Sequence, residues 1–339
     1  MKPLDPNAAA APDSGIFGLS DPPEDARVVL VPVPWEATTS YGGGTVDGPR
    51  AILQASRQVD LFDIETGRPY VAGIALLPEL ADVRRWNDAA QHAVRTILAD
   101  DSAANADLRT QVDELSERMN AHVQSTVQRW LDAGKLVGVV GGDHSVAFGA
   151  IAAHAARYPG LGILHFDAHA DLRRAYSGFE WSHASIMENV VRRVPAVSKL
   201  VQVGIRDLCE EEHERIAASL GRVRTFYDAE LARERFGGVS WAQQVERMLE
   251  DLPREIYVSF DIDGLDPVLC PHTGTPVPGG LSFQEACYVL SALVASGRRI
   301  VGFDLVEVAP AADGSEWDGN VAARLLYKLI GWALRSQNP

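Results

Sequence analysis

The stretch Leu161-Gly-Ile-Leu-His-Phe166, followed directly by Asp167-Ala-His-Ala-Asp171, decides the fold. Its first six residues form an apolar run of the length and composition typical of a strand that is buried on both faces of a sheet. Further runs of this kind lie along the chain, and longer segments with helical periodicity separate them. These further runs are residues 27–31, 73–77, 135–140, 199–203, 222–226, 255–260 and 299–303.

The alternation of strands and helices predicts an α/β fold with a doubly wound, parallel sheet and helices on both faces. Residues 27–339 are expected to form this fold as a single domain. Residues 1–26, which are rich in Ala, Pro, Asp and Gly, are expected to be a flexible N-terminal arm. Helical periodicity is clearest over residues 87–99, 110–133, 241–252, 283–296 and 320–336.

The composition restricts the classes of partner. With 46 acidic against 31 basic residues, the net charge of −15 argues against nucleic acid and anionic membranes. It fits a cationic substrate or divalent metals, and equally a surface that is acidic only for solubility. The scattered Cys209, Cys270 and Cys287 indicate neither disulfides nor a zinc motif, so we expect a cytoplasmic protein. We find no apolar run of the roughly 18 residues that a membrane span needs, and no secretory signal.

Acidic residues and histidines follow several of the predicted strands at the point where each strand ends. Gly141-Gly-Asp-His-Ser145, Asp167–Asp171 and Asp261-Ile-Asp263 all occupy such positions, and Asp304 with Glu307 follows the last strand. Open α/β sheets bind their ligands beyond the carboxyl ends of the strands. Because alternate residues of an extended chain point to one side, the polar side chains of each motif are expected to face one point. His165, within the strand, is expected to point into the core instead.

Four carboxylates brought together would repel one another strongly unless cations compensate their charge. Six residues are candidate metal ligands, which is more than one tetrahedral zinc ion needs. They suit two divalent ions that share bridging carboxylates and activate a water between them. Oxygen-rich ligation without thiolates favours Mn²⁺ over Zn²⁺. The six candidate ligands are His144, Asp167, His169, Asp171, Asp261 and Asp263.

At this point the sequence resembles the ureohydrolases, the arginase/agmatinase family, and most of all its agmatinase-like members. The resemblance extends over roughly residues 27–335, and the metal motifs occur in the family's order. Its matching stretches are residues 140–144, 163–171, 259–267, 273–280 and 303–310, with residues 32–35 and 48–52 upstream.

The resemblance implies an arginase-like three-layer α/β/α sandwich with an eight-stranded, mostly parallel sheet. It also implies a binuclear Mn²⁺ centre that hydrolyses guanidino compounds to urea and an amine, in a homo-oligomer such as a trimer or hexamer. One ion would be held by His144, Asp167, Asp171 and Asp261. The other would be held by His169, Asp167, Asp261 and Asp263, so that Asp167 and Asp261 bridge.

The same resemblance implies three catalytic residues. Glu307 matches the acid that pairs with the substrate guanidinium, and a planar cation with a fork of N–H donors does call for a carboxylate. His183 matches a mobile-loop histidine that shuttles protons, although alone it would be taken for an ordinary loop residue. Asp171 would hydrogen-bond the attacking hydroxide, and either Asp171 or His183 would protonate the leaving amine.

Departures from the family pattern leave the substrate open. Ala184 and His272 stand where other residues are usual, and Arg173 follows the metal motif closely. Arg173 could bind the carboxylate of a guanidino acid, or it could pair with a structural acid. Tyr176 and Trp181 could narrow the pocket. Agmatine, guanidinobutyrate, guanidinopropionate and guanidine therefore all remain candidate substrates, and Ni²⁺ remains an alternative metal.

Other classes of function fit the sequence less well. A metallophosphoesterase would need further motifs that we do not find, and a single-zinc deacetylase-like hydrolase would need fewer carboxylates. A non-enzymatic scaffold on the same fold has no reason to keep all six candidate ligands.

Overall fold

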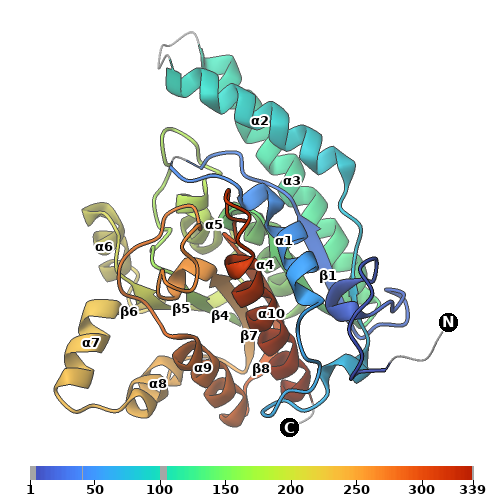
Figure 1. The fold of residues 1–339 in the computed structure, drawn as a ribbon. Coiled ribbons are helices and arrows are strands. Elements are labelled where there is room, and N and C mark those ends of the chain that lie inside the picture. The colour runs from blue at the N-terminus through green and yellow to red at the C-terminus, as the bar shows by residue number, and fades with distance from the viewer. Residues whose placement is uncertain (1–4, 40, 100–104, 338–339) are drawn as a thin grey trace.

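The computed structural model describes residues 5–39, 41–99 and 105–337, and its strands form one sheet (Figure 1). The strand order is β2-β1-β3-β8-β7-β4-β5-β6, and each pair of neighbours runs parallel. All the predicted strands are confirmed, and the sheet of the described residues is fully rather than mostly parallel. The strands are β1 (Val28–Val33), β2 (Ile74–Leu76), β3 (Leu136–Gly141), β4 (Leu161–Phe166), β5 (Val197–Ile205), β6 (Val223–Tyr227), β7 (Glu255–Asp261) and β8 (Arg299–Val306).

The helices include the five that periodicity predicts, now α2, α3, α8, α9 and α10, and five others. The others have only 8 to 11 residues each, which is too short for a reliable periodic signal. The bounds are α1 (Gly48–Ser56), α2 (Ala81–Ala99), α3 (Ala106–Asp132), α4 (Ala147–Arg157), α5 (Ile186–Arg193), α6 (Glu210–Ala217), α7 (Asp228–Phe236), α8 (Trp241–Leu249), α9 (Phe283–Ala295) and α10 (Trp317–Ser336).

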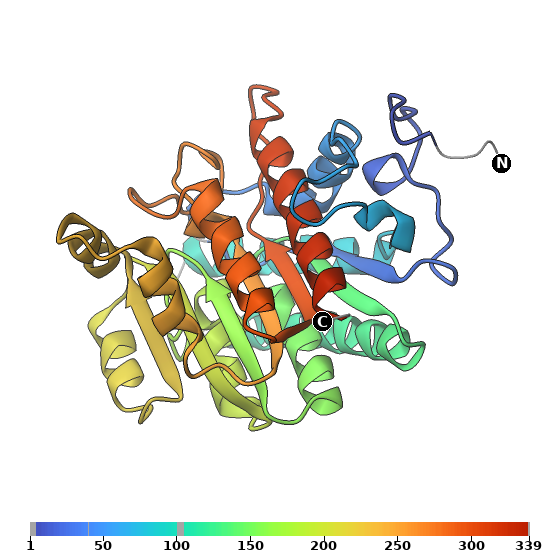
Figure 2. The same cartoon turned by 90° about the horizontal axis from the view of Figure 1, so that it is seen from below.

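The helices cover the two faces of the sheet and so form the expected three-layer α/β/α sandwich. One apolar cluster joins the sheet to α1, α7, α8, α9 and α10, and a second joins it to α3, α4, α5 and α6. The long α2 packs along α3 on the outside of the second layer (Figure 1). Seen after a quarter turn, the orange α9 and the red α10 lie over one face of the strands (Figure 2). No helix of the described ranges is both long and apolar enough to cross a membrane.

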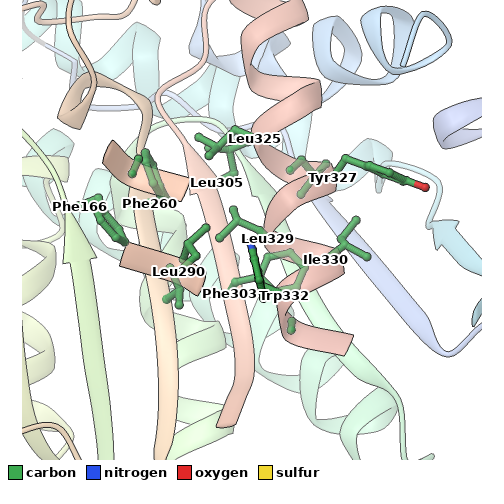
Figure 3. Packing of buried hydrophobic residues seen from close by; sticks show 14 of the residues in the cluster. Phe166, Phe260, Leu290, Phe303, Leu305, Leu325, Tyr327, Leu329, Ile330 and Trp332 are labelled. Atoms are coloured by element: carbon green, nitrogen blue, oxygen red, sulfur yellow. The ribbon is translucent and has the colours of Figure 1, made fainter. Parts of the chain in front are cut away.

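The core beneath α9 and α10 is built from large apolar side chains of the central strands (Figure 3). Phe166 of β4 and Phe260 of β7 stack with ring centroids 4.6 Å apart. Phe303 of β8 lies over Gly138 of β3, where a Cβ atom would come within 2.3 Å of the ring. The central strands are thereby held in register, and their carboxyl ends open at one edge of the sheet.

Part of the segment predicted as a flexible arm is packed on the domain. Ile16, Phe17 and Leu19 are buried, and the Phe17 N–H donates to Ser56 Oγ of α1 at 2.9 Å. The Phe17 ring lies 4.8 Å from the ring of Tyr327 on α10. Three large apolar side chains thus anchor residues 16–19 to the domain by burying their surface, and the flexibility of the arm as a whole stays a prediction. Residues 1–4 of the predicted arm lie outside the described residues.

Candidate metal centre

The strand order brings the polar motifs together. The strands β3, β8, β7 and β4 are consecutive in the sheet, so the residues that follow them share one stretch of its carboxyl edge. At three of these strand ends an aspartate carboxylate accepts a hydrogen bond from the backbone N–H of the residue two positions later. This bond forms a local turn that aspartate favours. The bonds run from Ser145 to Asp143 at 3.0 Å, from His169 to Asp167 at 2.6 Å, and from Asp263 to Asp261 at 2.8 Å.

The first cluster of candidate ligands surrounds His144. Its Nδ1 lies 3.1 Å from Asp167 Oδ2, 3.2 Å from Asp171 Oδ2 and 3.3 Å from Asp261 Oδ2, and all four side chains are buried. Within the described residues this nitrogen makes no well-formed hydrogen bond. Buried polar atoms normally find such a bond. An imidazole nitrogen facing three carboxylate oxygens therefore fits a set of ligands that converge on a cation.

The second cluster shares Asp167 with the first. His169 Nδ1 lies 3.0 Å from Asp263 Oδ2 and 3.4 Å from Asp167 Oδ1. Asp167 thus offers Oδ1 to one cluster and Oδ2 to the other, and Asp263 is held by the Ala168 N–H, which donates to its Oδ1 at 2.9 Å. All six predicted ligands are brought together, Asp261 through its approach to His144, and the histidine–carboxylate chemistry of both clusters fits divalent metal ions.

The charges of these residues are poorly balanced without cations. Burial, then the neighbouring Asp263 and Asp167, raise the pKa of Asp261 well above its ordinary value. Burial and Asp167 likewise raise the pKa of Asp171 to about 7. Although burial opposes its protonation, the surrounding carboxylates raise the pKa of His144 well above the usual range. Protons compensate part of the negative charge here, a role that divalent cations would take over.

A row of polar side chains, buried except for the half-buried Thr225, runs under the centre across five strands. Paired positions of the sheet place Thr225, Gln202, His165, Ser259 and Asp304 side by side, from β6 to β8. The prediction that His165 points away from the motif is wrong, because its Nε2 lies 2.8 Å from Asp167 Oδ2. Residues two positions apart on a strand share a face, and His165 and Asp167 obey this rule.

One end of the row orients His144. Its Nε2 lies 2.9 Å from Ser259 Oγ, which lies 3.0 Å from both carboxylate oxygens of Asp304. Burial raises the pKa of Asp304 to about 6, so its carboxylate is largely ionised at neutral pH and accepts from the hydroxyl. The hydroxyl then accepts from Nε2–H, which leaves the Nδ1 lone pair of His144 directed at the first cluster. Such support commonly fixes the ring of a metal-binding histidine.

Glu307 lies beside the first cluster at the end of β8. Its buried carboxylate accepts the His144 N–H through Oε1 at 2.8 Å, and its backbone carbonyl accepts from Thr273 Oγ1 at 2.7 Å. Burial, and then Asp143, raise its pKa well above the usual value. Glu307 has a φ of 62° and Asp171 a φ of 55°, a left-handed conformation that is strained for these residues and that clusters at functional sites.

His183 lies at the start of a short 3-10 turn, which Ser182 caps by accepting the Ala184 N–H at 3.3 Å. Its ring meets the edge of the Tyr176 ring at 5.9 Å. Burial, together with the nearby positive charges of His169 and His144, lowers the pKa of His183 to about 4. His183 is therefore close enough to the centre to sense its charge, and it is neutral at physiological pH.

Arg173 is engaged by the protein itself. Its Nε lies 3.5 Å from Glu212 Oε2, and its guanidinium lies 5.2 Å from the centroid of the Tyr176 ring. Glu212 is buried and also accepts the Leu172 N–H at 2.9 Å. Of the two possibilities left open by the sequence, this geometry matches the pairing with a structural acid.

The unusual His272 ties its loop to α10. Its backbone N–H donates to Asp318 Oδ1 at 3.0 Å, and its Nδ1 lies 2.8 Å from Asp318 Oδ2. Sequence reasoning assigned no role to Ser259 or Gln202, although Ser259 is two residues before Asp261 and so shares its side of β7. That spacing is a usable signal for Ser259, whereas Gln202 is recognisable only once β5 is known to pair with β4.

Comparison with known proteins assigns the chain to a family. A sequence model of the arginase family matches residues 26–331. N(1)-aminopropylagmatine ureohydrolase of Thermus thermophilus is 34% identical over 318 residues, which cover 93% of this chain and 94% of the relative. An agmatinase of Bacillus anthracis is 31% identical over 314 residues, covering 91% and 93%. The chain therefore belongs to the arginase family, as the sequence motifs predict.

Solved structures agree on the fold. The agmatine ureohydrolase of Thermoplasma volcanium has a TM-score of 0.71 at 23% identity and covers 93% of this chain and 92% of its own. The proclavaminate amidino hydrolase of Streptomyces clavuligerus has a TM-score of 0.73 at 24% identity, with 97% and 100% covered. At these identities the likeness establishes the arginase-like α/β architecture alone.

Proposed function

We propose that the protein is an agmatinase-like ureohydrolase, which hydrolyses a guanidino compound to urea and an amine with two divalent metal ions. One observation carries the proposal: Asp167 joins two His/Asp clusters, and Glu307 lies against the first of them. Family membership and relatives called agmatinase and N(1)-aminopropylagmatine ureohydrolase support the same reaction. A single-zinc deacetylase-like reaction is disfavoured because it would leave the second cluster without a purpose.

The ions would be held as the family resemblance implies, with Asp167 and Asp261 shared between them. Oxygen-rich ligation supports Mn²⁺, with Ni²⁺ as the alternative. The chemistry that the pair of ions supplies is hydroxide at neutral pH, because bound water loses a proton more readily. One site would consist of His144, Asp167, Asp171 and Asp261, and the other of His169, Asp167, Asp261 and Asp263.

The protein's own groups bind and orient the substrate. Glu307 would bind the guanidinium through Oε2, since Oε1 already accepts from the backbone of His144, and this fixes the carbon to be attacked. Gly274 lies beside Oε2, and a Cβ atom there would come within 3.5 Å of that oxygen, so a larger side chain would crowd the guanidinium-binding atom. A cationic substrate also compensates the buried charge of Glu307.

Proton transfer falls to Asp171 and His183. Asp171 can accept a hydrogen bond from the attacking hydroxide, take up that proton as the new bond to the guanidinium carbon forms, and pass it to the leaving amine. His183 is neutral and has both a free-base and an N–H nitrogen, so it can pass a proton between the site and solvent. Arg173 stays the candidate for binding a substrate carboxylate, but its pairing with Glu212 favours substrates that end in an amine.

Urea release from a panel of substrates tests the proposal. The protein is stripped of metal, reloaded with Mn²⁺, Ni²⁺ or Zn²⁺, and given agmatine, N(1)-aminopropylagmatine, arginine, guanidinobutyrate, guanidinopropionate or guanidine. We expect the amine-ended substrates to have the highest kcat/KM. The Asp167→Ala variant serves as a metal-site control. Absence of urea from every substrate, with two ions bound per chain, would contradict the proposal.

The cysteines and the family resemblance bear on the cellular setting and the assembly of the protein. The described cysteines Cys209, Cys270 and Cys287 are all free thiols, which supports a reducing cytoplasm. We infer a single catalytic domain over residues 27–339. A homo-oligomer, either a trimer or a hexamer, is inferred from the family resemblance, and light scattering of the purified protein tests it.

A further inference from the structure

A chain of side-chain hydrogen bonds leads from β6 to the shared ligand Asp167. Thr225 Oγ1 lies 2.8 Å from Gln202 Oε1, Gln202 Nε2 lies 3.1 Å from His165 Nδ1, and His165 Nε2 lies 2.8 Å from Asp167 Oδ2. Gln202, His165 and Asp167 are completely buried. Buried polar groups are normally paired with hydrogen-bond partners. Each group in this chain must therefore donate to one neighbour and accept from the other, which gives the hydrogen bonds a defined direction.

The backbone carbonyl of Ala170 shows which groups in this chain donate and which accept. Gln202 Nε2 also lies 2.7 Å from the backbone oxygen of Ala170, which can only accept. That atom of Gln202 must therefore be the amide nitrogen, which donates to His165 Nδ1 as well. With its Nδ1 accepting, neutral His165 carries its proton on Nε2 and donates it to Asp167. His165 is one of four clustered side chains of types that can bind a metal, together with His144, Asp167 and Asp171. Both of its ring nitrogens are already used in hydrogen bonds, so neither is available to a cation.

These donors decide which lone pairs of Asp167 stay available. Oδ1 accepts the backbone N–H of His169 at 2.6 Å, and Oδ2 accepts from His165. An ionised carboxylate has about four lone-pair positions, two on each oxygen. One position on each oxygen is taken, so one on each remains, and the two oxygens face different clusters. This is the arrangement that a carboxylate needs to bridge two cations.

We propose that His165, oriented by Gln202, is a positioning residue that holds Asp167 as a bridge between two divalent cations. The inference rests on the proposed function only in placing cations at these clusters. It assigns His165 no contact with substrate or metal. Outer residues that orient metal ligands typically change metal affinity by about 10–100-fold when they are removed.

Calorimetric titration of metal-free protein with Mn²⁺ tests this inference. His165→Leu removes the donor and should weaken binding of one of the two ions by about 10–100-fold. His165→Gln places an amide N–H near the position of Nε2 and should restore affinity to within a few-fold. His154→Leu is a matched control, because His154 is equally buried but bonds the carbonyl of Ala150 on α4. It should bind both ions as the unmodified protein does.

A spectroscopic measurement separates bridging from simple packing. In the Mn²⁺-loaded protein a shared carboxylate couples the two ions, and their electron paramagnetic resonance spectrum should report this coupling. His165→Leu should weaken the coupling, with Asp261 still shared between the ions, and His165→Gln should leave it unchanged. If His165→Leu does not fold, Gln202→Met removes the orienting amide one step away and should weaken the same ion.

Unchanged affinity and unchanged coupling in the folded variants would overturn the inference. Failure of the proposed function looks different. In that case the unmodified protein would bind two coupled ions and His165→Leu would loosen one of them, yet no guanidino substrate would yield urea.

Discussion

The strand ends after β4 and β7 each present a buried aspartate to the metal centre, but the two are supported differently. Asp167 and Asp261 both accept the N–H of the residue two positions on. Asp167 has in addition the imidazole of His165 on its second oxygen. For Asp261, the described residues offer Oδ2 only the Nδ1 of His144, at 3.3 Å and without a well-formed hydrogen bond.

This difference changes how each carboxylate holds its charge. Burial opposes ionisation of Asp167, but His165, His144 and His169 outweigh it and lower its pKa well below the usual value. Burial and the acidic neighbours Asp263 and Asp167 raise the pKa of Asp261 well above it. The protein itself thus keeps Asp167, after β4, ionised. Asp261, at the end of β7, needs bound cations to become ionised, so metal binding and ionisation are linked at this residue.

The largest effect is expected from removing either of the carboxylates that we propose as bridging ligands, Asp167 or Asp261. Asp167→Asn and Asp261→Asn should each lower kcat for urea release roughly 10³-fold, since a lost shared ligand removes much of the metals' charge stabilisation, which is worth several kcal/mol. Metal analysis should find fewer than two ions per chain in both variants. Equal losses would support two bridging roles, while a much smaller loss in Asp261→Asn would limit bridging to Asp167.

A half-buried acid outside the centre provides the control for this prediction. Asp113 on α3 also has a raised pKa, about 6, because of burial and the charge of Glu180. Asp113→Asn should retain both ions and at least half of the activity. Loss of metal in this variant would show that general acidity, rather than the position of Asp167 and Asp261, governs binding.

The sequence was sufficient for the parts of the fold that depend on local pattern. The buried apolar runs predicted every strand, because strands covered on both faces need apolar residues throughout. The order of the strands was not predictable in the same way, since any parallel strand can pair with several others. That order decides that Ser259 stands beside His165 on one side and Asp304 on the other.

The candidate ligands were predictable for a related reason. Each of them lies at or after the end of a strand, and alternation along the chain places each motif on one side. The support of these ligands lies across strands instead, and so it was missed. Alternation from Asp167 places His165 on the same side as the ligands, whereas Gln202 carries no such signal because its partner His165 is 37 positions away in the sequence.

The next largest effect is expected from removing the Ser259 hydroxyl of β7, which orients His144. Ser259→Ala removes the hydroxyl between His144 Nε2 and Asp304, so His144 loses its orientation and Asp304 loses a donor. Calorimetry should show an affinity for the ion at His144 that is weaker by about 10–100-fold. Ser259→Thr keeps the hydroxyl and should retain most of the affinity. Equal affinities of the two variants would exclude an orienting role for the hydroxyl.

The smallest effect is also the most direct comparison of the two aspartates, and it is measured without metal. In chelated protein at pH 7, Asp261→Asn should raise the melting temperature and Asp167→Asn should lower it. Asp261 is costly to keep in the folded state because its pKa there is raised, whereas Asp167 is stabilised as an anion by its donors. Each kcal/mol corresponds to a shift of about 2–4 °C in a domain somewhat smaller than this one.

The two variants are also expected to differ in how their change in melting temperature depends on pH. A raised folded-state pKa removes stability as the pH rises above the unfolded value of about 4, so the gain from Asp261→Asn should grow between pH 5 and pH 7. A lowered folded-state pKa gives stability that is fully present above the same value, so the loss in Asp167→Asn should be nearly constant over that range. Scanning calorimetry at both pH values measures the two slopes. If both variants shift in the same direction, the two strand ends carry their charges in the same way, and the contrast between Asp167 and Asp261 does not hold.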